Sequence, residues 1–500
     1  MRALGLHLAR GAVLGAVLGL VPTFAAAQVP NWPSEQPPRP LQAREVNFPP
    51  YEITSLKNGL QVVVVQHHEQ PIVTLRLLVR AGGAQDPPRK QGVAALAAAL
   101  LDQGAGTRSA AQIADAIDTI GGALSTGAGS DLSVADVLVM NDGLAFGFQL
   151  LADVVRRPAF HQQELDRQRQ QALSGMRVNY EDPDSVASLV FDRLVYGFHP
   201  YGLPNTGTPE SLAAITVADL RAFHKTWFVP NNTILGIVGD ITTADALAAA
   251  EKAFGDWQPG ELPTSDHPAP PPPTRRVVVI NKPDAVQTEV RVGHVALPRT
   301  HPDFLAFDLA LKILGGEGAN RLHQVLRSDR GLTYGASADL TSLRESGDFA
   351  AETDTRSDAT GEVLRLIVDE IARLQGEPVS LRELRSAQDY LAGKFPLTIE
   401  TPGAIATQVL DVLFYGLPLS DIETYRVRVN AITPDDIQRV ARQYLHPDRL
   451  SVVLVGNAAA FTGQLSGGGF DRFELVELPQ LDLSSVTFQR RPRPPAAGAR

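Results

Sequence analysis

A long internal repeat is the feature that most constrains what this chain can fold into. Residues 215–240 match residues 432–457 without a gap, and both copies show the same order of helix, proline, apolar strand and glycine. Upstream, residues 190–197 match residues 409–416. The two offsets, 217 and 219 residues, are nearly equal. Coincidence between amphipathic helices does not explain the shared order, so the repeat predicts two homologous halves.

Each half combines strands and helices in an order that favours the α+β class. Apolar runs and alternating patterns predict strands at 60–66, 72–80 and 233–238. Amphipathic segments with start and stop residues predict helices at 109–120, 160–179, 216–230 and 382–391, with Ser109 and Thr216 as N-caps and Gly121 as a stop. Strands, then helices, then a strand predict an antiparallel sheet with helices packed on one face, twice over.

Proline-rich stretches and composition changes divide the chain into six parts. We expect a signal peptide at 1–27, a proline-rich arm at 28–50, a first domain at 51–258, a proline-rich linker at 259–275, a second domain at 276–460, and a tail at 461–500 that is partly disordered, from about Ser484 onward.

The first 27 residues have the pattern of a secretory signal. Arg2 and Arg10 precede and flank an apolar run at 11–21, and Ala25 to Ala27 form a small-residue cleavage site. No later run is long and apolar enough to span a bilayer, so we expect no stable membrane insertion. The pattern predicts export to a bacterial periplasm, with an uncleaved signal acting as an anchor as the alternative.

Composition excludes two kinds of chemistry. The chain has no cysteine, so neither disulfides nor thiolate metal sites are possible. Its net charge is −10, and the signal carries two arginines and no acid, so the exported chain is more acidic still. An acidic chain without a basic cluster is a poor partner for nucleic acid.

An alanine-rich helix carries the most specific motif. The run Gly92-Val-Ala-Ala-Leu-Ala-Ala-Ala-Leu-Leu-Asp102, with its glycine-rich flanks, resembles the zinc-motif region of the pitrilysin/insulinase-like (inverzincin) peptidases. Active members carry His-x-x-Glu-His there, and the matching positions are Ala95, Ala98 and Ala99. The resemblance places the family's third ligand, a Glu, at Gly175. Alkyl groups and glycine neither hold a cation nor take a proton, so the resemblance implies a lost zinc site.

No other histidine pattern replaces that site. His161-Gln-Gln-Glu164 has half of a zinc motif but no second His after it, and the adjacent His67 and His68 point to opposite faces of a strand. We expect six further histidines to be polar surface or loop residues; these are His199, His224, His294, His301, His323 and His446.

The second half keeps a positive signal. Residues 320–335 resemble the family's C-terminal signature, in which an Arg and a Tyr reach the active site; they match Arg327 and Tyr334. The resemblance implies that this pair stabilises the oxyanion of the transition state. The alternative is that Arg327 complements a helix C-terminus and Tyr334 is ordinary core. A preceding glycine-rich loop resembles, loosely, a substrate-handling loop of relatives such as the mitochondrial processing peptidase, although a simple turn also fits; its glycines are Gly315, Gly316 and Gly318.

Together these features predict a subunit that works with a partner. The resemblance implies a heterodimeric peptidase in which a homologous chain with an intact His-x-x-Glu-His motif binds the zinc, while this chain holds no cofactor and supplies Arg327 and Tyr334. Unfolded peptides, bound in extended form along a sheet edge inside a closed chamber, would be the substrates. We expect neither activity nor stoichiometric zinc from this chain alone. The second class of function is a non-enzymatic structural or peptide-binding scaffold.

Overall fold

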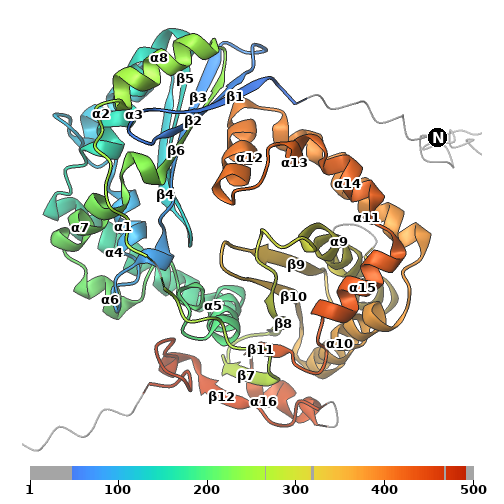
Figure 1. Cartoon of the computed structure of the whole chain (residues 1–500). Coiled ribbons are helices and arrows are strands. Elements are labelled where there is room, and N and C mark those ends of the chain that lie inside the picture. The colour runs from blue at the N-terminus through green and yellow to red at the C-terminus, as the bar shows by residue number, and fades with distance from the viewer. Residues whose placement is uncertain (1–47, 265, 317–319, 467–468, 491–500) are drawn as a thin grey trace, which may run out of the picture. The chain divides into compact units, whose positions relative to one another are not determined.

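The computed structural model describes residues 48–264, 266–316, 320–466 and 469–490. The expected signal peptide and nearly all of the proline-rich arm lie outside the described residues. The chain divides into two units after Glu45, and every described residue belongs to the second unit. Within that unit the chain forms two six-stranded sheets with helices packed against them (Figure 1).

The first sheet is built by the first half of the chain. Its strands lie in the order β1-β2-β6-β3-β5-β4. β2 and β6 run parallel, and every other neighbouring pair is antiparallel. The strand bounds are β1 Tyr51–Ser55, β2 Gln61–Gln66, β3 Ile72–Val79, β4 Ala123–Ala128, β5 Ser133–Met140 and β6 Thr233–Gly239. The helices of this half are α1 Val93–Ala99, α2 Ala110–Thr119, α3 Leu144–Arg156, α4 Gln162–Glu181, α5 Pro183–Tyr196, α6 Pro209–Ala214, α7 Val217–Trp227 and α8 Thr243–Phe254.

The second sheet repeats this arrangement. Its order is β12-β7-β11-β8-β10-β9, so five strands take the places of β2, β6, β3, β5 and β4 in the first sheet. The strand bounds are β7 Arg276–Asn281, β8 Gln287–Ala296, β9 Ala336–Ser342, β10 Gly347–Arg356, β11 Ser451–Gly456 and β12 Glu474–Glu477. The helices are α9 Phe304–Gly315, α10 Thr360–Gly376, α11 Leu381–Lys394, α12 Pro402–Phe414, α13 Ser420–Glu423, α14 Tyr425–Ala431, α15 Pro434–Tyr444 and α16 Ala458–Phe461.

This topology confirms the α+β class and the two homologous halves. The sheets are mixed, whereas the sequence pattern predicted antiparallel ones. The strand after the repeated helix, β6 or β11, returns to lie parallel to β2 or β7. In the second sheet β12 adds another parallel pair with β7.

Local sequence signals set the ends of the helices as expected. Thr216 and Thr433 cap the repeated helices α7 and α15. Each threonine hydroxyl accepts from the backbone N–H of an Asp three residues on, and the carboxylate of that Asp accepts from the backbone N–H of the threonine. Ser109 caps α2 in the same way, with Gln112. Gly121 takes a φ of +63° just beyond that helix, a conformation that glycine adopts without strain.

Helices pack on both faces of each sheet, and on one face the helix comes from the other half of the chain. Helices α1, α2, α3, α7 and α8 pack on one face of the first sheet. On the other face, α12 from the second half of the chain packs over β3 and β6. Conversely, α5 from the first half covers the face of the second sheet that α9, α10, α11 and α15 leave free. Apart from the exchanged helix, the helices of each half therefore pack on one face of its own sheet, as expected, and the helix that the other half supplies was not predicted.

The exchanged helices are copies of each other. α5 and α12 end within the matching segments 190–197 and 409–416. The valines of β2, four in a row, are all fully buried, because alternate side chains face the two helical layers. The duplication thus produced a reciprocal packing in which each half completes the core of the other (Figure 1).

The proline-rich linker and the C-terminal tail differ in regular structure. The described residues of 259–275 contain neither helix nor strand, as their prolines predict. In the tail, β12 pairs with β7 and Phe488 is fully buried, so residues 484–490 are ordered against the expectation for this stretch. No helix within the described ranges has the length and apolar character that crossing a membrane requires.

Candidate functional site

Helix α1 carries three of the four positions at which the family resemblance places zinc chemistry. The Asp86 carboxylate holds its start by accepting from the backbone N–H groups of Gly92 and Ala94, at 2.6 and 2.7 Å. Burial raises the pKa of Asp86 to about 7 against the lowering effect of these bonds. Ala95 and Ala99 are half-buried, while Ala98 is fully buried. The position of the family's general base is therefore packed into the core.

The fourth position, Gly175, lies on α4, which contacts α1. Gly175 is exposed, and a Cβ atom at this residue would meet nothing within 4 Å. Close packing therefore does not require a glycine here. Nothing else in the structure accounts for a glycine in the middle of a 20-residue helix.

Among the described residues, no group of histidines and carboxylates that could hold a metal ion lies at α1. Glu164 of the half motif pairs with Arg167 at 2.8 Å rather than with His161. His68 hydrogen-bonds Asp240 at 2.7 Å. In the part of the chain that the structure describes, the only group of three His, Asp or Glu side chains close enough to share an ion lies elsewhere, at His199, His267 and Glu345.

Two of the histidines expected at polar surface or loop positions are buried. His294 donates from Nδ1 to the carbonyl of Val295 at 2.7 Å, and its Nε2 accepts from the backbone N–H of His446 at 3.1 Å. Burial lowers the pKa of His294 to about 4, so it stays neutral. His199 is likewise buried. The expectation failed for His294, which lies within β8, because the distant His446 satisfies one of its ring nitrogens; His199 lies in the loop after α5, as expected, and its distant partner is Glu345.

Arg327 and Tyr334 line one pocket of about 380 Å³ in the second half. Arg327 lies on a π-helical segment, His323–Asp329, which ends where Gly331 takes a φ of +61°. The chain then reverses, and Tyr334 precedes β9. Both side chains are exposed, and Tyr334 reaches 83% exposure. Tyr334 is therefore not a core residue, so the alternative interpretation does not hold for this tyrosine.

The walls of this pocket are rich in basic and polar groups. Lys312, Lys394 and His323 line it together with Asn320, Ser337, Asp339 and Tyr390. His323 Nε2 lies 3.4 Å from Nη1 of Arg327 and can accept from it. Although burial works to lower the pKa of Lys312, the carboxylates of Asp308 and Asp339 outweigh it and raise that pKa. The pocket thus offers cationic donors to an anionic or developing negative charge.

The glycines before this segment have a packing role. Gly315 and Gly316 line the same pocket. A Cβ on Gly315 would lie 2.2 Å from the backbone nitrogen of Ala338, so only glycine lets the end of α9 approach β9 this closely. Gly318 lies outside the described residues.

Both the lost zinc positions and the Arg/Tyr pocket lie beside an edge strand. β4 is the edge of the first sheet and contacts α1. Its counterpart β9 is the edge of the second sheet and contributes Ala336, Ser337 and Asp339 to the pocket. Edge strands carry unpaired backbone N–H and C=O groups on which an extended peptide can add a strand.

Some residues that converge in the structure carry no sequence signal. His267 lies in the linker, and Glu345 lies in the turn between β9 and β10. They meet His199 although 78 and 146 residues separate Glu345 from the two histidines. No local spacing reports such an arrangement, because its members come from three separate segments.

Comparison with known proteins identifies the family of this fold and these motifs. Residues 61–208 match the family described as insulinase (peptidase family M16), and residues 214–391 match the peptidase M16 inactive domain. The second match includes both Arg327 and Tyr334.

Individual relatives cover most of the chain. An uncharacterized zinc protease of Mycobacterium leprae is 26% identical over 79% of this chain and 89% of its own length. Another, from Bacillus subtilis, is 22% identical over 78% and 95%. Among solved structures, a peptidase M16 inactive domain from Pseudomonas fluorescens has a TM-score of 0.77 at 30% identity, over 81% of this chain and 98% of that one. A protease from Helicobacter pylori has a TM-score of 0.76 at 21% identity, over 81% and 99%. On this agreement of sequence and structure, the chain belongs to peptidase family M16.

Proposed function

We infer that this chain is the non-zinc-binding subunit of a heterodimeric metallopeptidase that processes or degrades unfolded peptides in the periplasm. The observation that carries the proposal is a contrast between the two halves. The four positions of zinc chemistry hold only alanine and glycine, while Arg327 and Tyr334 remain exposed in one pocket. A scaffold has no need of such a pair on its surface.

The division of labour follows from the side chains present. A homologous partner with an intact His-x-x-Glu-His motif would bind the zinc, and its Glu would act as general base. Arg327 of this chain would donate to the oxygen on which negative charge develops, and the Tyr334 hydroxyl would act beside it. The basic residues that line the pocket outnumber its acidic residue Asp339, and this excess supports the role, since it favours negative charge.

Peptides in extended form are the substrates that the sheet edges favour. β4 and β9 are both edge strands, and each lies next to one of the two sites. Backbone pairing to an edge strand recognises an extended chain with little dependence on its sequence. The proposed specificity is therefore for unfolded segments rather than for a strict motif.

Reconstitution tests the proposal. The chain without residues 1–27 is purified alone and mixed with a homologous chain from the same organism that carries the intact motif. Cleavage of a quenched extended peptide is followed with and without a chelator. We expect no cleavage by this chain alone and chelator-sensitive cleavage after mixing. Chelator-sensitive cleavage by this chain alone would overturn the proposal. A mixed complex that forms but gains nothing over the partner alone would favour the scaffold function.

A further inference from the structure

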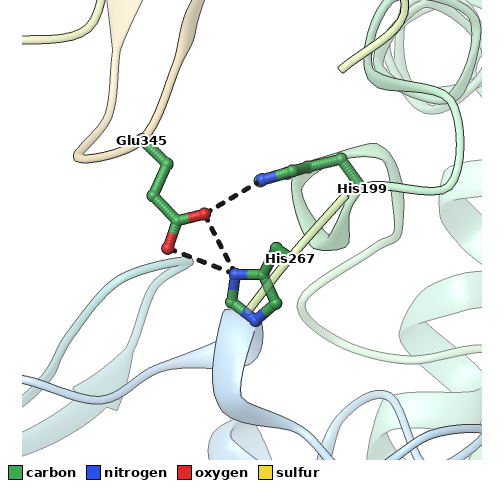
Figure 2. A group of neighbouring side chains, drawn as sticks. All are labelled: His199, His267 and Glu345. Carbon is green, nitrogen blue, oxygen red and sulfur yellow. Dashed lines mark hydrogen bonds and ion pairs between the residues drawn. The ribbon is translucent and has the colours of Figure 1, made fainter. Parts of the chain in front are cut away.

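A cluster of two imidazoles and one carboxylate joins three distant segments of the chain (Figure 2). His199 follows α5 in the first half, His267 lies in the proline-rich linker, and Glu345 lies at the tip of the hairpin between β9 and β10 in the second half. The cluster shares no residue with α1 or with the Arg/Tyr pocket.

The three side chains present their ligand atoms to one point. Nε2 of His199 lies 3.2 Å from Oε2 of Glu345, and Nδ1 of His267 lies 3.0 Å from the same oxygen. All ligand atoms are within 4.8 Å of one another. Two ligands bound at about 2.0–2.1 Å to a tetrahedral zinc ion lie roughly 3.4 Å apart, so little movement is needed to admit an ion.

The surroundings hold two of the ligands in place. The side chain of His199 is 1% exposed, and its ring lies edge-on to Tyr201 with 4.4 Å between the ring centroids. The hydroxyl of Tyr201 donates to Asp131 and accepts from the backbone N–H of Glu345. Asp131 also accepts from the backbone N–H of Arg344, at 2.8 Å. The hairpin tip is thus fixed to the first half before any ion binds, as a preorganised site requires.

An ion also has a route to the cluster. His267 lines a second pocket, of about 510 Å³, whose other walls include Asp86, Phe198 and Trp227. The side chains of His267 and Glu345 are 14% and 35% exposed. Ligand exchange with solvent is therefore possible at the linker side, while the His199 side is closed.

We propose that His199, His267 and Glu345 form a binding site for a divalent transition-metal ion of the zinc type, which clasps the linker to both halves. Two imidazole nitrogens and one carboxylate oxygen suit Zn²⁺ and its first-row neighbours, whereas Ca²⁺ and Mg²⁺ favour oxygen ligands throughout. Three protein ligands leave a fourth position for water.

Binding at Nε2 requires one rearrangement within the His199 ring. Nδ1 of His199 accepts from the backbone N–H of Tyr201 at 3.2 Å, so the ring proton lies on Nε2 in this arrangement. With a metal ion on Nε2, the proton of the neutral ring lies on Nδ1 and this long hydrogen bond is lost. Coordination outweighs the loss of one such bond between neutral groups.

Metal binding by the full exported chain tests the proposal independently of any peptidase activity. The chain, with its affinity tag removed, is stripped with a chelator and titrated with Zn²⁺ by calorimetry, and its bound zinc is counted by mass spectrometry. His267→Ala and Glu345→Gln are the test variants, because both residues are partly exposed. His161→Ala is the matched control, since it removes a histidine of the half motif outside the cluster.

We expect one zinc ion per chain for the unaltered protein and for His161→Ala. Both test variants should bind at least about tenfold more weakly, since loss of a supporting group alone has that effect. Zinc should raise the Tm of the unaltered chain and not that of His267→Ala. The absence of stoichiometric binding, or equal affinity in the unaltered chain and both test variants, would overturn the proposal. The sequence led us to expect no stoichiometric zinc in this chain alone. If the cluster binds zinc, that expectation holds only for the lost site on α1.

Discussion

The hydroxyl of Tyr196, at the end of α5, donates a 2.7 Å hydrogen bond to Asp348 at the start of β10. Both residues are buried. The bond joins a helix of the first half to the sheet of the second half, at the surface created by the exchange of α5 and α12. Burial raises the pKa of Asp348 to about 6, and the Tyr196 hydroxyl opposes that rise.

Removing this hydroxyl should weaken the contact between the halves. Tyr196→Phe leaves a buried carboxyl group without its donor, so we expect a loss of about 1–3 kcal/mol of unfolding free energy, larger at pH 8 than at pH 5. Urea unfolding at both pH values measures the loss. Tyr334→Phe is the control, because Tyr334 is 83% exposed and its hydroxyl should not affect stability. Equal stability of Tyr196→Phe and the unaltered chain would show that this bond contributes nothing.

A second carboxyl group at this surface should make stability depend on pH. Burial, with a contribution from Asp348, raises the pKa of Asp192 to about 7. The folded state thus favours the protonated form of Asp192. The contribution of protonated Asp192 to folding stability is fully present below the unfolded pKa near 3.8, and it is lost as the pH rises through about 7.

Asp192→Asn mimics the protonated form at every pH. The variant should match the unaltered chain in Tm at pH 4 and exceed it at pH 8, because each pKa unit corresponds to about 1.4 kcal/mol. Thermal unfolding across this range provides the measurement, and the exposed Asp142→Asn is the control. A Tm for Asp192→Asn below that of the unaltered chain at pH 8 would contradict the assigned direction.

Two glycines should respond to alanine with opposite signs. Gly175→Ala places a methyl group in open space on α4 and should stabilise the chain by about 1 kcal/mol. Gly315→Ala drives a methyl group against the backbone of β9, so it should cost about 1–3 kcal/mol. Thermal unfolding of both variants and of the unaltered chain measures the two changes in stability. A stabilising Gly315→Ala would show that the close approach of α9 to β9 is not tight.

Much of the fold was predictable because its signals are local or repeated. The caps at Ser109 and Thr216 fixed two helix starts, and the repeat identified two homologous halves. What failed required knowledge of contacts between distant segments. The matching segments in α5 and α12 reveal a duplication, but an amphipathic helix does not specify which sheet its apolar face will cover.

The site residues also fall into those that the sequence indicated and those that only the tertiary fold brings together. That Arg327 and Tyr334 act at one place was implied by the family resemblance and not by their spacing, since Gly331 ends the helical segment between them; the structure places both in one pocket. His199, His267 and Glu345 meet only because the linker and a hairpin tip return to the end of α5. The parallel pairing of β2 with β6 also depends on tertiary packing rather than on strand pattern.

Turnover of the reconstituted pair with Arg327→Ala tests the central claim most directly. Arg330→Ala is the matched control, since Arg330 lies three residues on, is exposed, and pairs with Glu362 outside the pocket. The account predicts that Arg327→Ala lowers kcat about a hundredfold or more while the zinc content of the complex is unchanged, and that Arg330→Ala has little effect. Equal turnover for Arg327→Ala and the unaltered chain, in a complex of the same composition, would contradict it.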